Sequence, residues 1–157
     1  MKHTISCLVE NRFGVLARIA GLFSARGFNI TSLTVGETED PSVSRMTIVV
    51  EGDDRILEQV NKQLNKLIDV IVVQDLTKRG FIERELILVT VKADGRTRSD
   101  IQQMAEINEA KIVNMSSNTV TIEMRGTGNR IQEFIELFKP FGITELVRTG
   151  RIAIAKN

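Results

Sequence analysis

Residues 10–16 (ENRFGVL) hold the groups of this chain best suited to bind a small charged molecule. They join a predicted strand to a predicted helix. Gly14 has no side chain, so a ligand can come close to the backbone amides at the start of that helix. Free N–H groups and the helix dipole at this end favour a carboxylate. The amide of Asn11 both donates and accepts hydrogen bonds, which suits the ammonium and carboxylate groups of a zwitterion.

A second candidate, Asn29, opens the strand that follows the same helix, after Gly27. For this order of elements that strand is expected at a sheet edge, and an exposed edge must be paired, covered or blunted. Pairing two copies would bring Asn29 of one toward residues 11–14 of the other. Taken singly, these residues also fit a simpler interpretation. Asn11 and Asn29 are common cap or turn residues, and Gly14 suits a tight turn.

Groups for catalysis are scarce. The chain has one histidine, one cysteine, no tyrosine and no tryptophan, so few side chains titrate near neutral pH. We expect Cys7 to be a small core residue, as free cysteines usually are, and His3 to be a surface residue near the terminus. No His, Cys or carboxylate spacing predicts a metal site or a nucleophile with its base. We therefore predict no catalytic and no metal-binding residue on this chain.

Hydrophobic periodicity predicts the elements of the first half. An alternating strand at residues 3–10 precedes an apolar helical stripe from Val15 to Phe23, which Gly27 is placed to end. The elements that follow are a strand at 29–36, a polar turn at 37–42, a strand at 45–51, a helix capped by Asp53 and a strand at 69–76. The order is therefore β-α-β-β-α-β.

The same pattern returns in the second half. The predicted elements are a strand at 85–92, a helix at 97–108 with a capping box of Ser99 and Gln102, strands at 111–115 and from 118, a helix at 128–138, and a strand or hairpin at 146–155 bending at Gly150. The fold class is α+β, with two tandem ferredoxin-like sandwiches. The predicted domains are residues 1–76 and 83–157, joined by a linker at 77–82.

Two glycine-containing turns in the second half are further candidate sites. Residues 125–129 (RGTGN) precede a helix and could hold an anion on backbone amides, but they lack the lysine and the spacing of a phosphate loop. A plain strand-to-helix turn is the favoured interpretation. Residues 94–99 are expected to form a turn and a helix cap.

Composition narrows the classes of partner. The net charge is +1, which offers no long-range attraction for nucleic acid or anionic membranes. An RNA-binding sheet would need stacking aromatics, and the predicted strands contain almost none. With one cysteine, short apolar runs and no export signal, we expect a cytoplasmic protein without a membrane span. A stand-alone enzyme using carboxylates is disfavoured because no pair of them sits in a plausible pocket loop.

Residues 9–18 (VENRFGVLAR) together with 21–30 (GLFSARGFNI) resemble the opening of ACT domains. More specifically, they resemble the small regulatory subunit of bacterial acetolactate synthase. Residues 32–36 (SLTVG) and 44–50 (SRMTIVV) fit the same family. The chain length and the second half fit it as well, so the resemblance covers essentially the whole chain, with an ACT domain at 1–76.

The resemblance implies an effector site built from two chains of an ACT homodimer. Its residues would be Asn11, Gly14, Val15 and Leu16 from one chain and Asn29 and Ile30 from its neighbour, with Leu16, Ile30 and Val35 suited to an isopropyl group. The implied effector is valine. The implied partner is the large catalytic subunit, which would carry thiamine diphosphate, Mg²⁺ and FAD, while this chain carries no cofactor. The alternative is a stand-alone ACT-type sensor of amino acids acting on another partner.

Overall fold

The computed structural model describes residues 1–157 and contains two compact units. Unit 1 comprises Met1–Ile82 and Arg151–Asn157, and unit 2 comprises Glu83–Gly150. The predicted division at 76 and 83 differs from these units in two ways. Residues 77–82 belong to unit 1 instead of forming a free linker, and the final seven residues return to unit 1 after unit 2 is complete.

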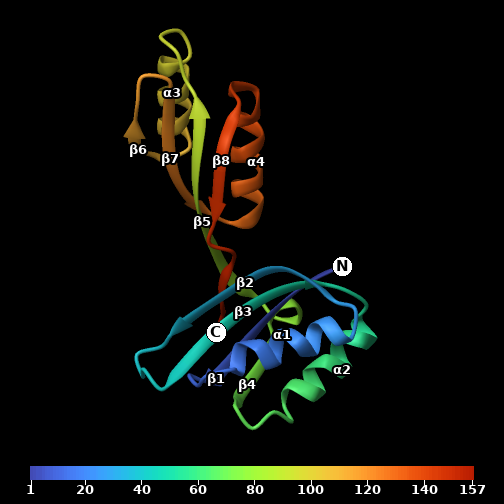
Figure 1. Ribbon diagram of the computed structural model, residues 1–157. Coiled ribbons are helices and arrows are strands. Elements are labelled where there is room, and N and C mark those ends of the chain that lie inside the picture. The colour runs from blue at the N-terminus through green and yellow to red at the C-terminus, as the bar shows by residue number, and fades with distance from the viewer. The chain divides into compact units, whose positions relative to one another are not determined.

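Unit 1 is a four-stranded antiparallel sheet with two helices, in the predicted β-α-β-β-α-β order (Figure 1). Its elements are β1 (Lys2–Glu10), α1 (Val15–Ala25), β2 (Asn29–Glu37), β3 (Val43–Glu51), α2 (Asp54–Leu64), β4 (Val70–Asp75) and a 3₁₀ turn, η1 (Leu76–Lys78). The strands lie side by side in the order β2-β3-β1-β4. The predicted edge position of the second strand is therefore confirmed.

The core of unit 1 lies between the sheet and its two helices. Alternate residues of β1 face the helices, and Ile5, Cys7 and Val9 are buried there with the apolar stripes of α1 and α2. The core position predicted for Cys7 is confirmed. The surface position predicted for His3 is wrong, because its side chain is only 1% exposed. His3 follows the same alternation and pairs with Val50, so the strand is already ordered at this residue.

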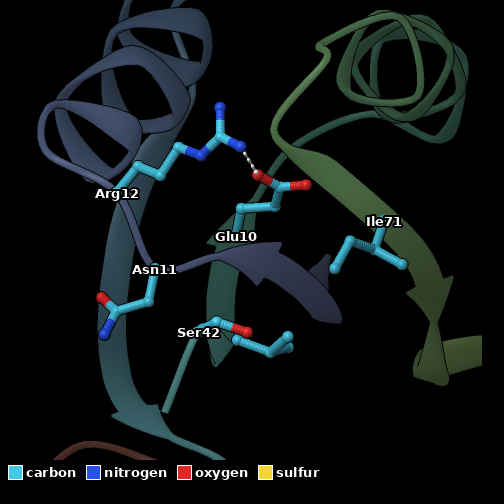
Figure 2. A pocket seen from close by; sticks show the side chains of 6 residues that line it. Glu10, Asn11, Arg12, Ser42 and Ile71 are labelled. Carbon is cyan, nitrogen blue, oxygen red and sulfur yellow. Dashed lines mark ion pairs between the residues drawn. The ribbon is translucent and has the colours of Figure 1, made fainter. Parts of the chain in front are cut away.

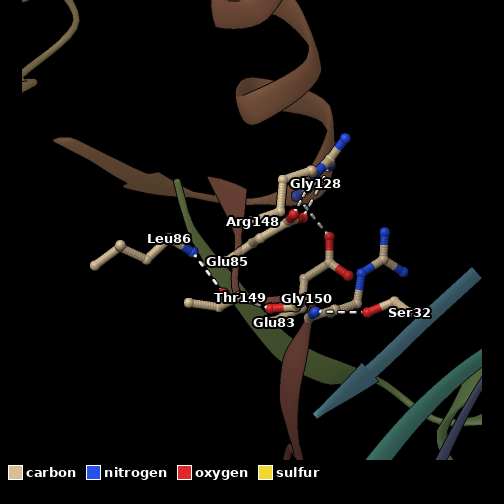
Figure 3. Close-up of polar contacts among 9 residues, drawn as sticks. Ser32, Glu83, Glu85, Leu86, Gly128, Arg148, Thr149 and Gly150 are labelled. Atoms are coloured by element: carbon tan, nitrogen blue, oxygen red, sulfur yellow. Dashed lines mark hydrogen bonds and ion pairs between the residues drawn. The ribbon is translucent and has the colours of Figure 1, made fainter. Parts of the chain in front are cut away.

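The other face of this sheet carries small polar residues. Thr4, Ser6 and Thr47 are all buried on it. Arg151 contacts this face: its N–H donates to Ser32 Oγ at 2.8 Å (Figure 3), and its guanidinium donates to Thr4 Oγ1 at 3.4 Å. Beyond β4, Thr77 Oγ1 accepts from the Thr4 N–H at 2.8 Å along the edge of β1. The returning strand β9 (Ile152–Ala155) pairs with β5 (Phe81–Lys92), whose first residues lie in unit 1.

Unit 2 repeats the architecture. Its elements are the rest of β5, α3 (Arg98–Ile107), β6 (Lys111–Met115), β7 (Thr119–Gly126), α4 (Gly128–Phe138), a 3₁₀ turn, η2 (Lys139–Phe141), and β8 (Ile143–Arg148). Its strand order, β6-β7-β5-β8, corresponds position by position to that of unit 1. A second core forms between this sheet and the helices α3 and α4. The predicted fold class, α+β with two β-α-β-β-α-β sandwiches, is confirmed.

Two local predictions in unit 2 are wrong. The residue preceding α3 is Thr97, and no side chain caps this helix, so Ser99 and Gln102 do not form a capping box. Instead, Asp94 accepts from the N–H groups of Arg96 and Thr97 in the turn before it. The last strands also do not form a hairpin with each other. Gly150, with φ 86°, separates β8 from β9, and each of these strands pairs with β5.

Candidate functional site

The predicted loop between β1 and α1 leaves the start of the helix accessible. Gly14 occupies the cap position with φ 83°, a left-handed conformation that glycine adopts without strain. It has no side chain, and no side chain of any other residue caps α1. The first N–H groups of a helix lack intrahelical partners, so they can bind a carboxylate at this end.

Asn11 is held in place by three hydrogen bonds. Its backbone N–H donates to the Ser42 carbonyl at 2.8 Å, and its side-chain amide donates to Glu37 Oε1 at 3.2 Å and to the Pro41 carbonyl at 3.0 Å. These contacts tie the loop to the end of β2 and to the turn that follows. The side-chain N–H groups are engaged, and the amide oxygen is the atom left to accept from a ligand ammonium.

Asn29 and Ile30 lie at the opposite end of the same sheet. Asn29 pairs with Glu51, which pairs with Lys2 at the start of β1. At the other end of β2, Glu37 pairs with Ser44, which pairs with Val9 near the end of β1. At about 3.3 Å per residue, the two ends of β2 are roughly 26 Å apart. One chain therefore does not bring Asn29 to Asn11. The predicted set is one site only if a second chain contributes to it.

The apolar members of the predicted set differ in accessibility. Val15 is 4% exposed and packs in the core, so only its backbone can face a ligand. Leu16 is 45% exposed and Val35 is 43% exposed. Ile30 is half-buried against the core of unit 1. An isopropyl group at this loop would therefore meet Leu16 and Val35, and not the side chain of Val15.

A cavity of about 350 Å³ beside Asn11 involves residues that the sequence interpretation missed (Figure 2). It is lined by Glu10, Asn11, Arg12, Ser42, Val43 and Ile71. Arg12 Nη2 lies 2.8 Å from Glu10 Oε2, and in Figure 2 these two side chains point toward each other while Asn11 points away. The sequence signal for this pair is the opposite charge of Glu10 and Arg12, two residues apart where β1 ends. These two residues place a guanidinium and a carboxylate next to the predicted loop.

The remaining reactive groups do not gather into a catalytic centre. Cys7 is buried, and desolvation raises the pKa of its thiol to about 12, partly offset by the Arg45 charge. A thiol of that pKa is not a nucleophile at neutral pH. No three His, Cys, Asp or Glu residues lie close enough to hold a metal ion. No helix has the length and apolar character needed to cross a membrane.

The turn at residues 125–129 binds an anion of its own chain. Thr127 caps α4, accepting from the Arg130 N–H, which confirms the strand-to-helix turn. The Gly128 N–H donates to Glu83 Oε1 at 3.2 Å (Figure 3). Close by, Arg148 binds both oxygens of the buried Glu85, at 2.6 and 3.2 Å. An internal carboxylate therefore occupies the amide that an external anion would use.

Comparison with known proteins covers both units. Residues 5–72 match the family described as AHAS small subunit-like ACT domain, and residues 84–157 match the family described as small subunit of acetolactate synthase. The "probable acetolactate synthase small subunit" of Archaeoglobus fulgidus is 53% identical over 157 residues, covering 100% of this chain and 98% of that protein. The acetolactate synthase small subunit of Aquifex aeolicus is 48% identical, with 99% of this chain and 82% of that protein covered.

A solved structure supports the same assignment. The crystal structure of the acetolactate synthase small subunit from Thermotoga maritima matches with a TM-score of 0.90 and 39% identity, covering 100% of this chain and 98% of that one. The matches extend over both units, and the description they share is that of the small subunit of acetolactate synthase. This chain belongs to the family of acetolactate synthase small subunits, with an ACT domain in its first half.

Proposed function

We propose that this chain is a valine sensor that activates the large catalytic subunit of acetolactate synthase and confers feedback inhibition on it. The observation that carries the proposal is the start of α1, which follows Gly14 and has no side-chain cap. The side-chain amide of Asn11, held by the Pro41 carbonyl, lies in the same loop. The helix start suits the carboxylate of an amino acid, the Asn11 oxygen suits its ammonium group, and Leu16 suits a branched side chain.

The edge strand β2 supports a site shared by two chains. Antiparallel pairing of two copies about a two-fold axis at Leu33, the middle of β2, would set Asn29 of one copy opposite Gly36 of the other, next to Glu37, once the bulge between Ile30 and Ser32 is counted. Glu37 is the residue to which the Asn11 side chain is bonded. The same pairing would bring Asn29 and Ile30 of each copy to the loop of its neighbour, giving two equivalent sites. A homodimer is therefore part of the proposal.

Regulation follows from linkage between binding and assembly. Valine held between two chains favours the arrangement of the pair that binds it better. The catalytic subunit responds only if it binds the two arrangements with different affinity. Thiamine diphosphate, Mg²⁺ and FAD would all be carried by that larger chain in the cytoplasm, while this chain contributes no reacting group.

Co-purification with the catalytic subunit and an activity assay with and without valine test the whole proposal. Wild-type chain should raise synthase activity, and valine should lower it again. Asn29→Ala should weaken valine binding in calorimetry by about tenfold, as expected for loss of a hydrogen bond to a charged group, while activation persists. Asn114→Ala, at an exposed asparagine on the edge strand of unit 2, is the matched control and should bind valine normally.

Three results would contradict the proposal in different ways. Absence of both heat and a melting shift at saturating valine would remove the sensor role, since a bound ligand must stabilise the folded state. Normal valine binding without any effect on the synthase would favour a sensor acting on another partner. Lost activation with intact valine binding in Asn29→Ala would assign Asn29 to the docking of the catalytic subunit instead.

A further inference from the structure

Phe13 is a feature of unit 1 that its own fold does not explain. It lies in the loop between Arg12 and Gly14, and its side chain is 102% exposed. The other six phenylalanines of the chain are buried or half-buried. Phe23 and Phe28, for example, pack edge to face in the core with ring centroids 6.3 Å apart. Phe13 makes no such ring contact, so it contributes nothing to the packing of the single chain.

Two further exposed apolar side chains lie at the same end of unit 1. Leu16 is in the first turn of α1, immediately after the loop. Val35 pairs with Met46, which pairs with Cys7, so its side chain is on the helix-covered face of the sheet at the exposed edge. Phe13, Leu16 and Val35 are 102%, 45% and 43% exposed, respectively. We call these three residues the Phe13 patch.

The charges at the two ends of β2 indicate that a second copy covers this patch. Glu37, Glu39 and Asp40 lie at one end, in and after β2, and Arg26 lies just before its other end. Antiparallel pairing of two copies brings these three carboxylates of each copy to the end of the other copy that carries Arg26, beside Glu51, the residue that pairs with Asn29. Parallel pairing would instead place the three carboxylates of one copy against the same three of the other, so antiparallel pairing is favoured.

The same register supplies an apolar surface for the patch. Ile30 pairs with Val50, so its side chain lies on the helix-covered face, as that of Val35 does. With the two-fold axis at Leu33, and with the bulge between Ile30 and Ser32 counted, Ile30 of the second copy falls opposite Val35 on the same face. The half-buried Ile30 of one copy and the Phe13 patch of the other are therefore brought to the same place.

We infer that Phe13 is the residue that closes the effector site, its ring packing against Ile30 of a second copy and covering the apolar side chain of the bound amino acid. This inference rests on the proposed function and adds a residue to that site. A large aromatic ring excludes water from the helix start and strengthens the electrostatic binding of the carboxylate there. Because the ring finds its partner only on the second chain, the isolated chain leaves the effector site open to solvent.

The absence of tryptophan and tyrosine from the chain permits a direct test. Phe13→Trp introduces the only indole, so all tryptophan emission reports on this position. We expect a shift to shorter wavelength and protection from acrylamide quenching when the chain dimerises and binds valine. Ile68→Trp is the matched control, because Ile68 is 93% exposed in the connection between α2 and β4, away from β2. Its emission should remain that of a solvated indole throughout.

Calorimetry on Phe13→Ala and Phe13→Leu completes the test, with sedimentation measured in parallel. Phe13→Ala should bind valine about tenfold more weakly, as for an aromatic hot spot, and Phe13→Leu should retain most of the affinity. A solvated indole at position 13 in the valine-bound dimer, or wild-type affinity in Phe13→Ala, would overturn the inference, as would a monomeric valine complex. A dimer with a protected indole that binds no valine would uphold the Phe13 contact between chains while refuting its role at the effector site together with the proposed function.

Discussion

Gly52, in the turn from β3 to α2, sits directly against the ring of Phe28. A Cβ added at Gly52 would overlap this ring, and even the Cζ atom would lie only 2.9 Å away. Phe28 is 7% exposed and packs against Phe23, so its ring has little room to move. Phe28 also immediately precedes Asn29, the start of the proposed second half of the effector site. Gly52→Ala is therefore expected to displace Phe28 and to disturb that start.

The expected cost is that of overpacking, about 1–3 kcal/mol of the free energy of unfolding. For a chain of this length the melting temperature falls about 2–4 °C per kcal/mol, which gives a decrease of roughly 2–12 °C. Thermal melts followed by circular dichroism measure it, with Gly21→Ala as the control. Gly21 lies inside α1 with nothing within 4 Å of an added Cβ, so alanine should stabilise the protein by about 0.5–1 kcal/mol. Unchanged melting of Gly52→Ala would refute the close packing of Phe28.

Two further predictions concern groups outside the effector site. Burial raises the pKa of the Cys7 thiol to about 12. This thiol should therefore resist a thiol reagent at mildly alkaline pH in the native protein and react fully in denaturant. Rapid labelling of the native protein would contradict its burial. The N–H groups of Thr97 and Arg96 hold the pKa of Asp94 below its ordinary 3.8, so its stabilising contribution is present above pH 3.8 and is lost as the pH falls through the folded-state pKa. Asp94→Asn should therefore melt below wild type at neutral pH, and the two should converge in acid; a constant difference would exclude this titration.

Much of the fold could be predicted because its signals are local. Alternation along β1 and the apolar stripe of α1 identify their buried faces without any knowledge of the rest of the chain. The edge position of β2 followed from the order of the elements, and the cap of α2 by Asp53 followed from residue type. The loop of Asn11 and Gly14 was proposed as a carboxylate site from residue type, and that role stays a prediction.

The features that were missed depend on contacts between residues distant in sequence. The burial of His3 requires pairing with Val50, and the role of Glu83 requires the amide of Gly128, 45 residues later. The return of residues 151–157 to unit 1 depends on partners such as Ser32, 119 residues from Arg151. No periodicity within a short window carries this information. The cavity beside Glu10 and Arg12 likewise combines β1 with the start of β3 and with β4.

The return of residues 151–157 makes unit 2 an insertion within unit 1, and this has a consequence for synthesis of the protein. The ribosome completes β1 to β4 early, but β9 is made only after the whole of unit 2. Until then the Arg151 contacts to Ser32 and Thr4 cannot form, and the polar face of the unit 1 sheet lacks part of its cover. Nascent unit 1 therefore cannot reach its final form before both units have been translated, which ties maturation of the proposed amino-acid site to the presence of the second unit.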